Sequence, residues 1–132
     1  QAMDELYKKY GWFAEKTVSF SISGSQPMEQ VGSIMKSLRD SNDSAVAGTD
    51  IICLRDYKLK RIRNFRTGEI SQTTLPVSDV LYYELENGCS VVVRPSGTEP
   101  KVKLYVLTVG ENKFECFDRI NKYVEFFSEK LK

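Results

Sequence analysis

The sequence contains no histidine among its 132 residues. Histidine is the usual general base of Ser-His-Asp triads and Cys-His dyads, and it is the commonest metal ligand. Its absence therefore excludes both catalytic arrangements and every metal site that needs an imidazole. If this chain contributes to an enzyme, we expect the acid–base group to be supplied from outside it.

Cysteine is scarce as well. Cys53, Cys89 and Cys116 are widely spaced, and no Cys-x-x-Cys pair is present. An odd number of scattered thiols is typical of small buried side chains in a reducing compartment, not of a disulfide framework or a zinc site. A reactive thiol is the alternative, but the sequence offers no histidine to lower its pKa.

Neither an excess of one charge nor a long apolar run is present. The 19 Lys and Arg residues against 18 Asp and Glu residues leave a net charge of +1. This balance argues against general nucleic-acid or membrane-surface binding, which depends on excess positive charge. No apolar run approaches the ~20 residues that span a bilayer, and no signal-peptide pattern opens the sequence. We therefore expect a cytoplasmic location and no membrane partner.

The length fits one domain, with a short segment before it. Apolar residues share one helical face over Met3–Tyr10, and Gly11 is a natural end for that helix. No cap precedes the helix, so we expect residues 1–15 to be the end of a preceding domain's helix and a linker. Residues 16–132 would form the domain itself. The linker can serve as a hinge or as a fixed connector, and the sequence favours neither.

Hydrophobic periodicity divides the domain into strands and helices. Alternating apolar residues predict strands over Lys16–Ile22 and Lys101–Thr108, and a short apolar run predicts another over Asp50–Leu54. Apolar residues at spacings of three and four predict helices over Pro27–Arg39 and Lys113–Leu131.

Two polar segments separate some of these elements. Arg55–Gly68 is strongly basic and irregular, and Ser71–Ser78, which contains Pro76, is predicted to be a loop. On the last helix, the spacing predicts an inward-facing stripe made up of Phe114, Phe117, Ile120, Val124, Phe127 and Leu131.

Asn87-Gly88 is a strong signal for a β-hairpin, because a type I′ turn needs a positive φ at both central positions. It predicts strands over Val80–Glu86 and Cys89–Arg94, joined by a two-residue turn. Helices interspersed with hairpin-linked strands indicate an α+β fold, an antiparallel sheet of four to six strands with two helices on one face. The residue pairs expected from the turn are Glu86 with Cys89, Glu84 with Val91, and Leu81 with Arg94.

The residues with the clearest chemical meaning lie in the loop 94–101. Arg94 offers a planar fork that can bind two oxygen atoms at once, and Ser96 and Thr98 offer hydroxyl donors. Gly97 permits the backbone to turn its N–H groups toward an anion. A plain turn is the alternative, since Ser, Gly and Pro are common turn residues. The residues alone indicate an anion-binding loop and nothing more specific.

The sequence of this loop, Arg94-Pro95-Ser96-Gly97-Thr98-Glu99-Pro100-Lys101, resembles the phosphate-binding loop of the α-D-phosphohexomutases. Glu5–Gly11, followed by Val18-Ser19-Phe20, is similar to the family's link from its third into its fourth domain. Asp56-Tyr57 and Leu75–Leu81 are also similar to segments that lead to the loop. The resemblance covers most of the chain and best fits the phosphoglucomutase/phosphomannomutase branch.

The resemblance implies a C-terminal domain with a curved, TATA-binding-protein-like sheet and helices on one side. It implies that the loop holds the phosphate of a bound sugar phosphate that is not being transferred. It places no catalytic residue and no metal ligand in this chain. The residues implied as phosphate contacts are Arg94, Ser96, Gly97 and Thr98, with Lys101 and Lys103 as further basic positions.

The resemblance also implies an isomerase of carbohydrate metabolism, in which a phosphoserine and a hexose phosphate exchange phosphoryl groups through a bisphosphorylated sugar. The family's phosphoserine loop, magnesium loop and sugar-recognition loop do not occur here. We therefore expect one domain of four, inactive alone, with no cofactor of its own and with magnesium in the full-length enzyme. Its expected partners are the hexose phosphate and the other domains of the same chain, and the isolated domain is expected to be monomeric.

Two other functions stay open, a stand-alone anion-binding module and a nucleic-acid-binding domain. The second rests on a basic run with few aromatic residues among its charges, so we expect a solvated hairpin or loop and no nucleic-acid partner. Glu84 and Glu86 resemble an acid–base pair, but we expect them to be solvated charges beside a turn. The basic run consists of Arg55, Lys58, Lys60, Arg61, Arg63 and Arg66.

Overall fold

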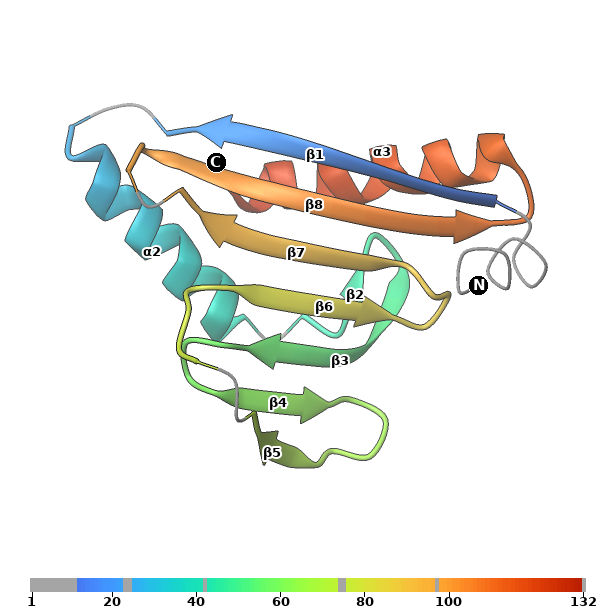
Figure 1. The fold of residues 1–132 in the computed structure, drawn as a ribbon, viewed down its shortest axis with the longest axis horizontal. Coiled ribbons are helices and arrows are strands. Elements are labelled where there is room, and N and C mark those ends of the chain that lie inside the picture. The colour runs from blue at the N-terminus through green and yellow to red at the C-terminus, as the bar shows by residue number, and fades with distance from the viewer. Residues whose placement is uncertain (1–11, 23–24, 42, 74–75, 97, 132) are drawn as a thin grey trace.

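The chain forms one antiparallel sheet with the strand order β1-β8-β7-β6-β3-β4-β5, and β2 pairs with β3 off this path (Figure 1). The computed structural model describes residues 12–22, 25–41, 43–73, 76–96 and 98–131. The helix expected over Met3–Tyr10 lies outside these residues. The strands are β1 (Trp12–Ser21), β2 (Ala45–Val46), β3 (Thr49–Asp56), β4 (Arg61–Asn64), β5 (Ile70–Gln72), β6 (Leu81–Leu85), β7 (Ser90–Pro95) and β8 (Lys101–Gly110).

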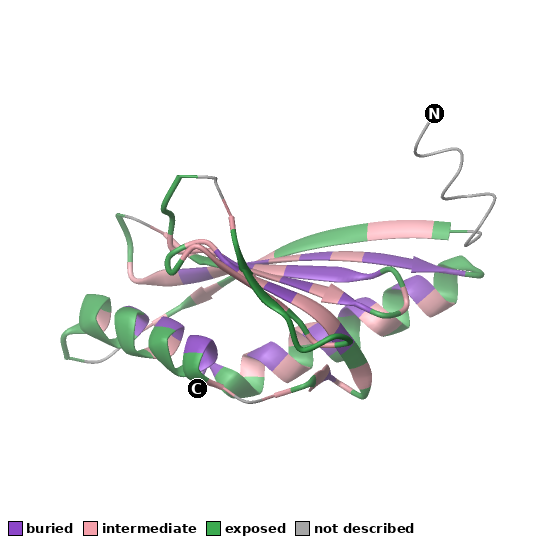
Figure 2. Cartoon of the chain, turned by 90° about the horizontal axis from the view of Figure 1, so that it is seen from below, coloured by how far each residue is buried: buried purple, intermediate pink, exposed green. Residues whose placement is uncertain are grey.

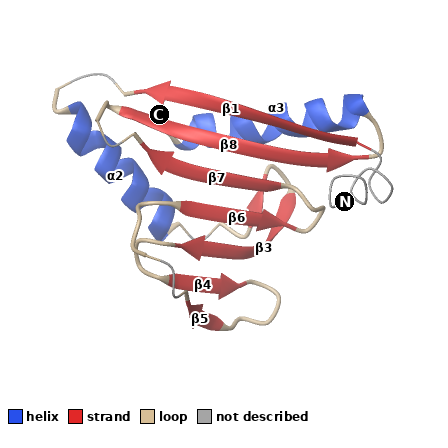
Figure 3. Cartoon of the chain, viewed as in Figure 1, coloured by secondary structure: helices blue, strands red, loops and turns tan. Residues whose placement is uncertain are grey.

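Two helices, α2 (Pro27–Asp40) and α3 (Lys113–Lys130), cover one face of the sheet and leave the other face open (Figures 2 and 3). This arrangement confirms the expected α+β architecture. In the described part of the chain, neither helix combines the length and the apolar character needed to cross a membrane.

In the part of the chain that the structure describes, the sheet has eight strands, more than the four to six expected. Among the additional strands are β4 and β5, which fall in the segments predicted to be irregular or loop. The β4 sequence is Arg-Ile-Arg-Asn, and three of its four residues are half-buried, so no alternation of apolar and polar residues marks it as a strand. Pairing of its backbone with β3 and β5 holds it in the sheet.

The core lies between the helix-covered face of the sheet and the two helices. Along β8, Val102, Leu104 and Val106 are buried while the residues between them are half-exposed, which confirms the predicted alternation. Each such side chain contributes about 1.5–3 kcal/mol when it is fully buried. The helices add Val31, Met35 and Leu38 from α2, and Ile120, Tyr123 and Phe127 from α3.

The β6–β7 hairpin has the predicted place but not the predicted register. Glu84 pairs with Ser90, and Leu81 pairs with Val93 instead of Arg94. Only Gly88 of the turn has a positive φ, at 85°, so the type I′ turn is not formed. A three-residue loop replaces it, closed by a hydrogen bond from the Leu85 amide to the Cys89 carbonyl at 2.9 Å. The extra loop residue shifts every pair by one.

Helix α3 begins as predicted, and part of the predicted stripe faces the core, since Ile120, Phe127 and Leu131 are buried. The Asn112 side chain caps it by accepting a hydrogen bond from the Glu115 amide at 2.8 Å. Phe114 is 83% exposed and Phe117 is 48% exposed, so the prediction that both face inward is wrong. The helix face that meets the sheet contains the small side chain of Cys116. A small residue fits there because the start of α3 lies close to Gly110 at the end of β8. The buried residues of α3 are Cys116, Ile120, Tyr123 and Phe127.

Candidate functional site

Arg94 lies at the end of β7 on the open face of the sheet. Its neighbour Val93 is completely buried on the helix-covered face, and because successive side chains of a strand alternate, Arg94 faces the other way. It is exposed and lies directly opposite Lys103 of β8. Lys103 in turn lies opposite Ser19 of β1. The sheet therefore places one arginine, one lysine and one hydroxyl in a row across three strands.

The loop after Arg94 is fastened to the sheet by its backbone. The Ser96 amide donates a hydrogen bond to the Lys101 carbonyl at 2.9 Å, and the Lys101 amide donates to the Glu99 carbonyl at 2.8 Å. On its other side the Pro100 carbonyl accepts from the Ile22 amide at 2.7 Å. The Ser96 amide is therefore engaged within the protein, so its hydroxyl is the group that it can offer to a ligand.

The other candidate residues of the loop are Ser96, Gly97 and Thr98. Gly97 lies outside the described residues. Thr98 is exposed, and Ser96 is half-buried beside Arg94. No hydrogen bond within the described part of the chain occupies the Ser96 or Thr98 hydroxyl. Both hydroxyls can therefore donate to a ligand.

The two lysines of the site differ in their partners. The Lys101 ammonium lies 3.2 Å from a carboxylate oxygen of Glu99. Neither Arg94 nor Lys103 forms an ion pair with any residue that the structure describes. Like charges directly opposite each other on neighbouring strands are destabilising. An anion bound between these two side chains would remove that repulsion.

Ser19 is the one member of this row that the sequence did not indicate. The alternation in its strand places it on the polar face, but nothing in the sequence identifies β8 as its partner strand. Only the pairing of β1 with β8 brings its hydroxyl beside Lys103.

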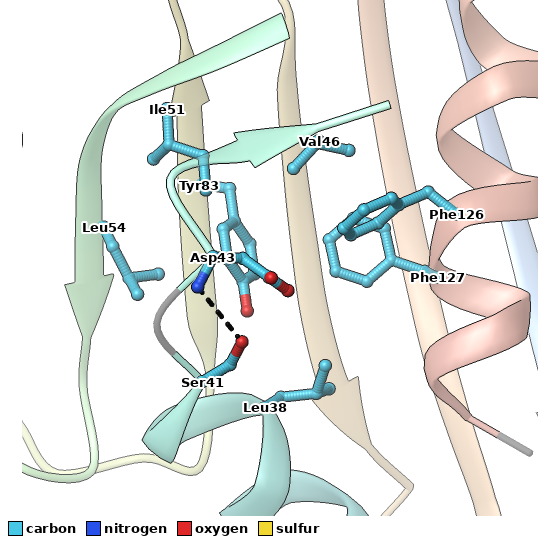
Figure 4. Close-up of a pocket in the computed structure, with 9 residues that line it drawn as sticks. All are labelled: Leu38, Ser41, Asp43, Val46, Ile51, Leu54, Tyr83, Phe126 and Phe127. Atoms are coloured by element: carbon cyan, nitrogen blue, oxygen red, sulfur yellow. Dashed lines mark hydrogen bonds between the residues drawn. The ribbon is translucent and has the colours of Figure 1, made fainter. Parts of the chain in front are cut away.

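One enclosed cavity among the described residues is too small to be a ligand site. It lies between the sheet and the helices and has a volume of about 10 Å³, with Asp43 and Tyr83 among its lining residues (Figure 4). Pockets for small molecules have volumes of roughly 300–1,000 Å³, so this cavity is too small for a sugar phosphate. Burial raises the pKa of Tyr83, which keeps its hydroxyl neutral.

The other sequence candidates are dispersed. Arg55 faces the open side, where it forms an ion pair with Glu84 and lies 5.5 Å from the centre of the Tyr82 ring. Arg61 and Arg63 pair with the helix-facing residues of β3, so the basic run does not form one surface. The three cysteines are free thiols, and burial raises the pKa of Cys116, which disfavours a reactive thiolate.

A family model described as phosphoglucomutase/phosphomannomutase, C-terminal domain, matches residues 32–113, more than half of the chain. The chain belongs to this family. The matched segment contains β7, the loop after it and all of β8, so it includes Arg94 and Lys103. The resemblance noted in the loop is thereby confirmed, as is the assignment to the C-terminal domain.

Phosphoglucomutases and related enzymes are similar to this C-terminal domain along most of its length. A phosphoglucomutase of Staphylococcus saprophyticus is 31% identical over 112 residues, covering 85% of this chain and 20% of the relative. A probable phosphomannomutase of Haemophilus influenzae is 30% identical over 117 residues, covering 89% of this chain and 20% of the relative. The chain therefore spans about a fifth of the length of these relatives.

A crystal structure of the exocytosis-sensitive phosphoprotein pp63/parafusin, a phosphoglucomutase from Paramecium, in its open form, is also similar. Its TM-score is 0.46 at 9% identity, and the match covers 93% of this chain and 21% of the other.

The phosphoglucomutase/phosphomannomutase family implies magnesium, and the residues described here do not fit a site for it. Among them, no group of three or more Asp, Glu, Cys or His side chains could hold a metal ion. Glu99 is the acidic residue of the loop 94–101, and its carboxylate pairs with Lys101.

Proposed function

We propose that this domain binds the phosphate of a hexose phosphate in a phosphoglucomutase or phosphomannomutase. The observation that carries the proposal is the position of Arg94 opposite Lys103, without a carboxylate partner for either among the described residues. The planar guanidinium can donate to two phosphate oxygens at once, and the ammonium adds a second charge.

Four further residues complete the proposed contact set. Ser96 and Thr98 would donate from their hydroxyls, and Gly97 would allow close approach of the backbone. Lys101 would contribute less than Lys103, because Glu99 already neutralises it. None of these groups reads the sugar, so the site would accept a phosphate on either end of the substrate.

A site that binds phosphate without contacting the sugar suits a reaction that passes through a bisphosphorylated intermediate. In the full-length enzyme, the phosphoserine of another domain would donate its phosphoryl group and recover the other phosphate after the intermediate has turned round. Each orientation presents a non-reacting phosphate to Arg94 and its neighbours. Binding of that phosphate would hold the reacting oxygen in position. The serine and the magnesium ion would belong to the other domains, so we propose that this domain alone is inactive.

The expected affinity of the domain alone is low. Hydrogen bonds to charged groups contribute roughly 1.5–3 kcal/mol each, and two or three are available here. Association costs at least ~4 kcal/mol. The remaining few kcal/mol corresponds to a dissociation constant of about 1 mM.

Phosphate titration of the 132-residue chain, followed by NMR, tests the proposal. We expect the signals of Ser96, Thr98 and Lys103 to shift with a dissociation constant of about 1 mM. Arg94→Ala should abolish the shifts. Arg66→Ala is the matched control, because Arg66 is an exposed arginine far along the sheet in the β4–β5 connection.

Two results would count against the phosphate site. The first is that loop signals do not move at tens of millimolar phosphate. The second is that Arg94→Ala and Arg66→Ala weaken binding equally, which would indicate attraction by overall charge. A shift in the wild type that is lost only in Arg94→Ala supports the site.

A further inference from the structure

A shallow hollow on the open face of the sheet lies beside the row that contains Arg94 and Lys103. It has a volume of about 220 Å³ and is open to solvent. The strands that form it are neighbours in the sheet, and they lie side by side in Figure 1. Its lining includes Thr17 of β1, Tyr105 of β8, Val92 of β7 and Tyr82 of β6.

The strand register places these four side chains in one row. Tyr105 pairs with Thr17 on one side and with Val92 on the other, and Val92 also pairs with Tyr82. The neighbours of Tyr105 in β8 are buried on the helix-covered face, so Tyr105 faces the open side. We call the row formed by Thr17, Tyr105, Val92 and Tyr82 the tyrosine row.

The tyrosine row lies next to the row of charged residues. Tyr105 follows Lys103 by two positions on β8, and Val92 precedes Arg94 by two positions on β7. At ~3.3 Å per residue, the two rows are about 7 Å apart along the strands. In a hexose phosphate, only an oxygen, or an oxygen and a carbon, separate the phosphorus from the sugar ring. A phosphate held by Arg94 and Lys103 therefore has its sugar within reach of the tyrosine row.

Tyr105 has the chemical character that contact with a sugar requires. Its side chain is half-buried, and no hydrogen bond within the described part of the chain occupies its hydroxyl. A hexose has C–H groups on the faces of its ring and hydroxyls around the edge. A tyrosine can pack its ring against the first and form a hydrogen bond with the second. Sites for small molecules combine aromatic walls with a few polar groups in the same way.

Tyr82, on the other side of the hollow, is already engaged within the protein. The Arg55 guanidinium lies 5.5 Å from the centre of its ring and also forms an ion pair with Glu84. Val92 lies between the two tyrosines and has a shorter side chain than either, so it forms the floor of the hollow. Tyr105 is therefore the aromatic residue of the row that is free to contact a ligand.

We propose that Tyr105 contacts the sugar of the bound hexose phosphate, with its ring packed against one face of the hexose, while Arg94 and Lys103 hold the phosphate. This inference rests on the proposed function, since the phosphate fixes where the sugar lies. Pockets that enclose a whole ligand have volumes of roughly 300–1,000 Å³, so the hollow receives one face of the sugar only. Contact with a ring face does not depend on the orientation of any one hydroxyl. Glucose and mannose phosphates should therefore benefit equally from Tyr105.

Binding of phosphate esters to the 132-residue chain, followed by NMR, tests the inference. Methyl phosphate carries the same charged group as glucose 6-phosphate but lacks the sugar. We expect glucose 6-phosphate and mannose 6-phosphate to bind roughly two- to tenfold more tightly than methyl phosphate, as one aromatic contact would provide. The Tyr105 signals should shift strongly with the two sugar phosphates and little with methyl phosphate, whereas the Lys103 signals should shift with all three esters.

Two substitutions of Tyr105 separate the contribution of its ring from that of its hydroxyl. Tyr105→Ala should weaken binding of glucose 6-phosphate to the level of methyl phosphate and leave the affinity for methyl phosphate unchanged. Tyr105→Phe should keep most of the preference, because the ring remains. Phe114→Ala is the matched control, because it removes an aromatic ring that is 83% exposed on α3, outside the hollow. Circular dichroism checks that Tyr105→Ala is folded, and the comparison of esters on the wild type does not depend on that variant.

Failure of the sugar contact can be distinguished from failure of the phosphate site. Equal binding of methyl phosphate and the sugar phosphates would leave the phosphate site in place and overturn the sugar contact. A preference for sugar phosphates that Tyr105→Ala retains would also overturn it, because the sugar would then lie elsewhere on the domain. If none of the esters binds, the proposed function fails and the sugar contact fails with it.

Discussion

The guanidinium of Arg39, near the end of α2, donates a hydrogen bond to a carboxylate oxygen of Asp56 at 2.8 Å, and both side chains are buried. A second nitrogen of the same group donates to Asp79 at 2.7 Å. The other oxygen of Asp56 accepts from the amides of Lys58 and Leu59. One arginine therefore holds α2 to the end of β3 and to the segment before β6.

Replacing Arg39 should destabilise the domain strongly. In Arg39→Ala the Asp56 carboxylate stays buried without its cation, and loss of one partner of a buried ion pair costs about 3–5 kcal/mol. Urea unfolding followed by circular dichroism measures this change in the free energy of unfolding.

Lys36→Ala is the control for that substitution. The Lys36 ammonium lies 2.7 Å from Asp40 on the same helix, but both side chains are largely exposed. Exposed pairs of this kind contribute less than about 1 kcal/mol. A loss in Arg39→Ala no larger than that in Lys36→Ala would show that the buried pair does not hold the helix.

Acid should weaken the contact between Asp43 and α3. The Lys130 ammonium lies 2.6 Å from the Asp43 carboxylate, and this hydrogen bond lowers the pKa of Asp43. A carboxyl group with a lowered pKa in the folded state stabilises the protein above its unfolded pKa, and the contribution is lost as the pH falls through the folded value. The wild type should therefore exceed Asp43→Asn in stability near neutral pH, and the difference should shrink as the pH falls below the ordinary pKa of an aspartate.

Thermal unfolding of both proteins between neutral and acid pH measures that difference. Asp118→Asn serves for comparison, since the Lys122 ammonium is 3.9 Å from Asp118. Both of these side chains are largely exposed, so Asp118→Asn should change the stability by less than about 1 kcal/mol. A stability difference for Asp43→Asn that is constant with pH would exclude titration of this carboxyl group as its source.

Removing the charge of Lys103 should stabilise the domain when no phosphate is present. Lys103→Thr abolishes the repulsion from Arg94 and introduces a residue that suits a strand, so we expect a gain of about 0.2–1 kcal/mol. The gain should shrink in 1 M NaCl, where the Debye length is about 3 Å. Chemical unfolding in a phosphate-free buffer at low and high salt measures it.

Lys101→Thr should give no comparable gain, because it leaves Glu99 without its cation. The same Lys103→Thr variant should bind phosphate more weakly than the wild type. A variant that is neither more stable nor weaker in binding would mean that Arg94 and Lys103 do not act on one another or on a common anion.

Phosphate should raise the stability of the wild-type domain. A ligand at ten times a dissociation constant of about 1 mM stabilises the folded state by roughly 1.4 kcal/mol. Thermal unfolding in 10 mM phosphate, compared with sodium chloride at the same ionic strength, measures the increase. Arg94→Ala should show no increase, and an equal increase in that variant would place the bound phosphate elsewhere.

The elements that could be predicted from the sequence are those whose periodicity is marked by core residues. The helix at Pro27 and the strand at Lys101 have regular apolar spacing, and the structure has both where they are expected. The β4 strand could not be predicted, since its alternating residues are half-buried arginines, which give no apolar signal.

The register of the β6–β7 hairpin could not be predicted from the sequence for a different reason. Asn87-Gly88 permits either a two-residue turn or a three-residue loop in which only the glycine has a positive φ, and the two differ by a single position. The place of Arg94 could be predicted, because it follows a buried valine at the end of a strand. Its neighbour across the sheet could not, because that depends on which strands pair.

Alternate residues of β8, from Lys101 to Val106, are under different structural constraints. Val102, Leu104 and Val106 are confined to shapes that fill the interior. Lys101, Lys103 and Tyr105 face outward and can be exchanged at little expense to folding. Substitutions at positions 101, 103 and 105 can therefore change the outward surface of this strand, while positions 102, 104 and 106 preserve the core.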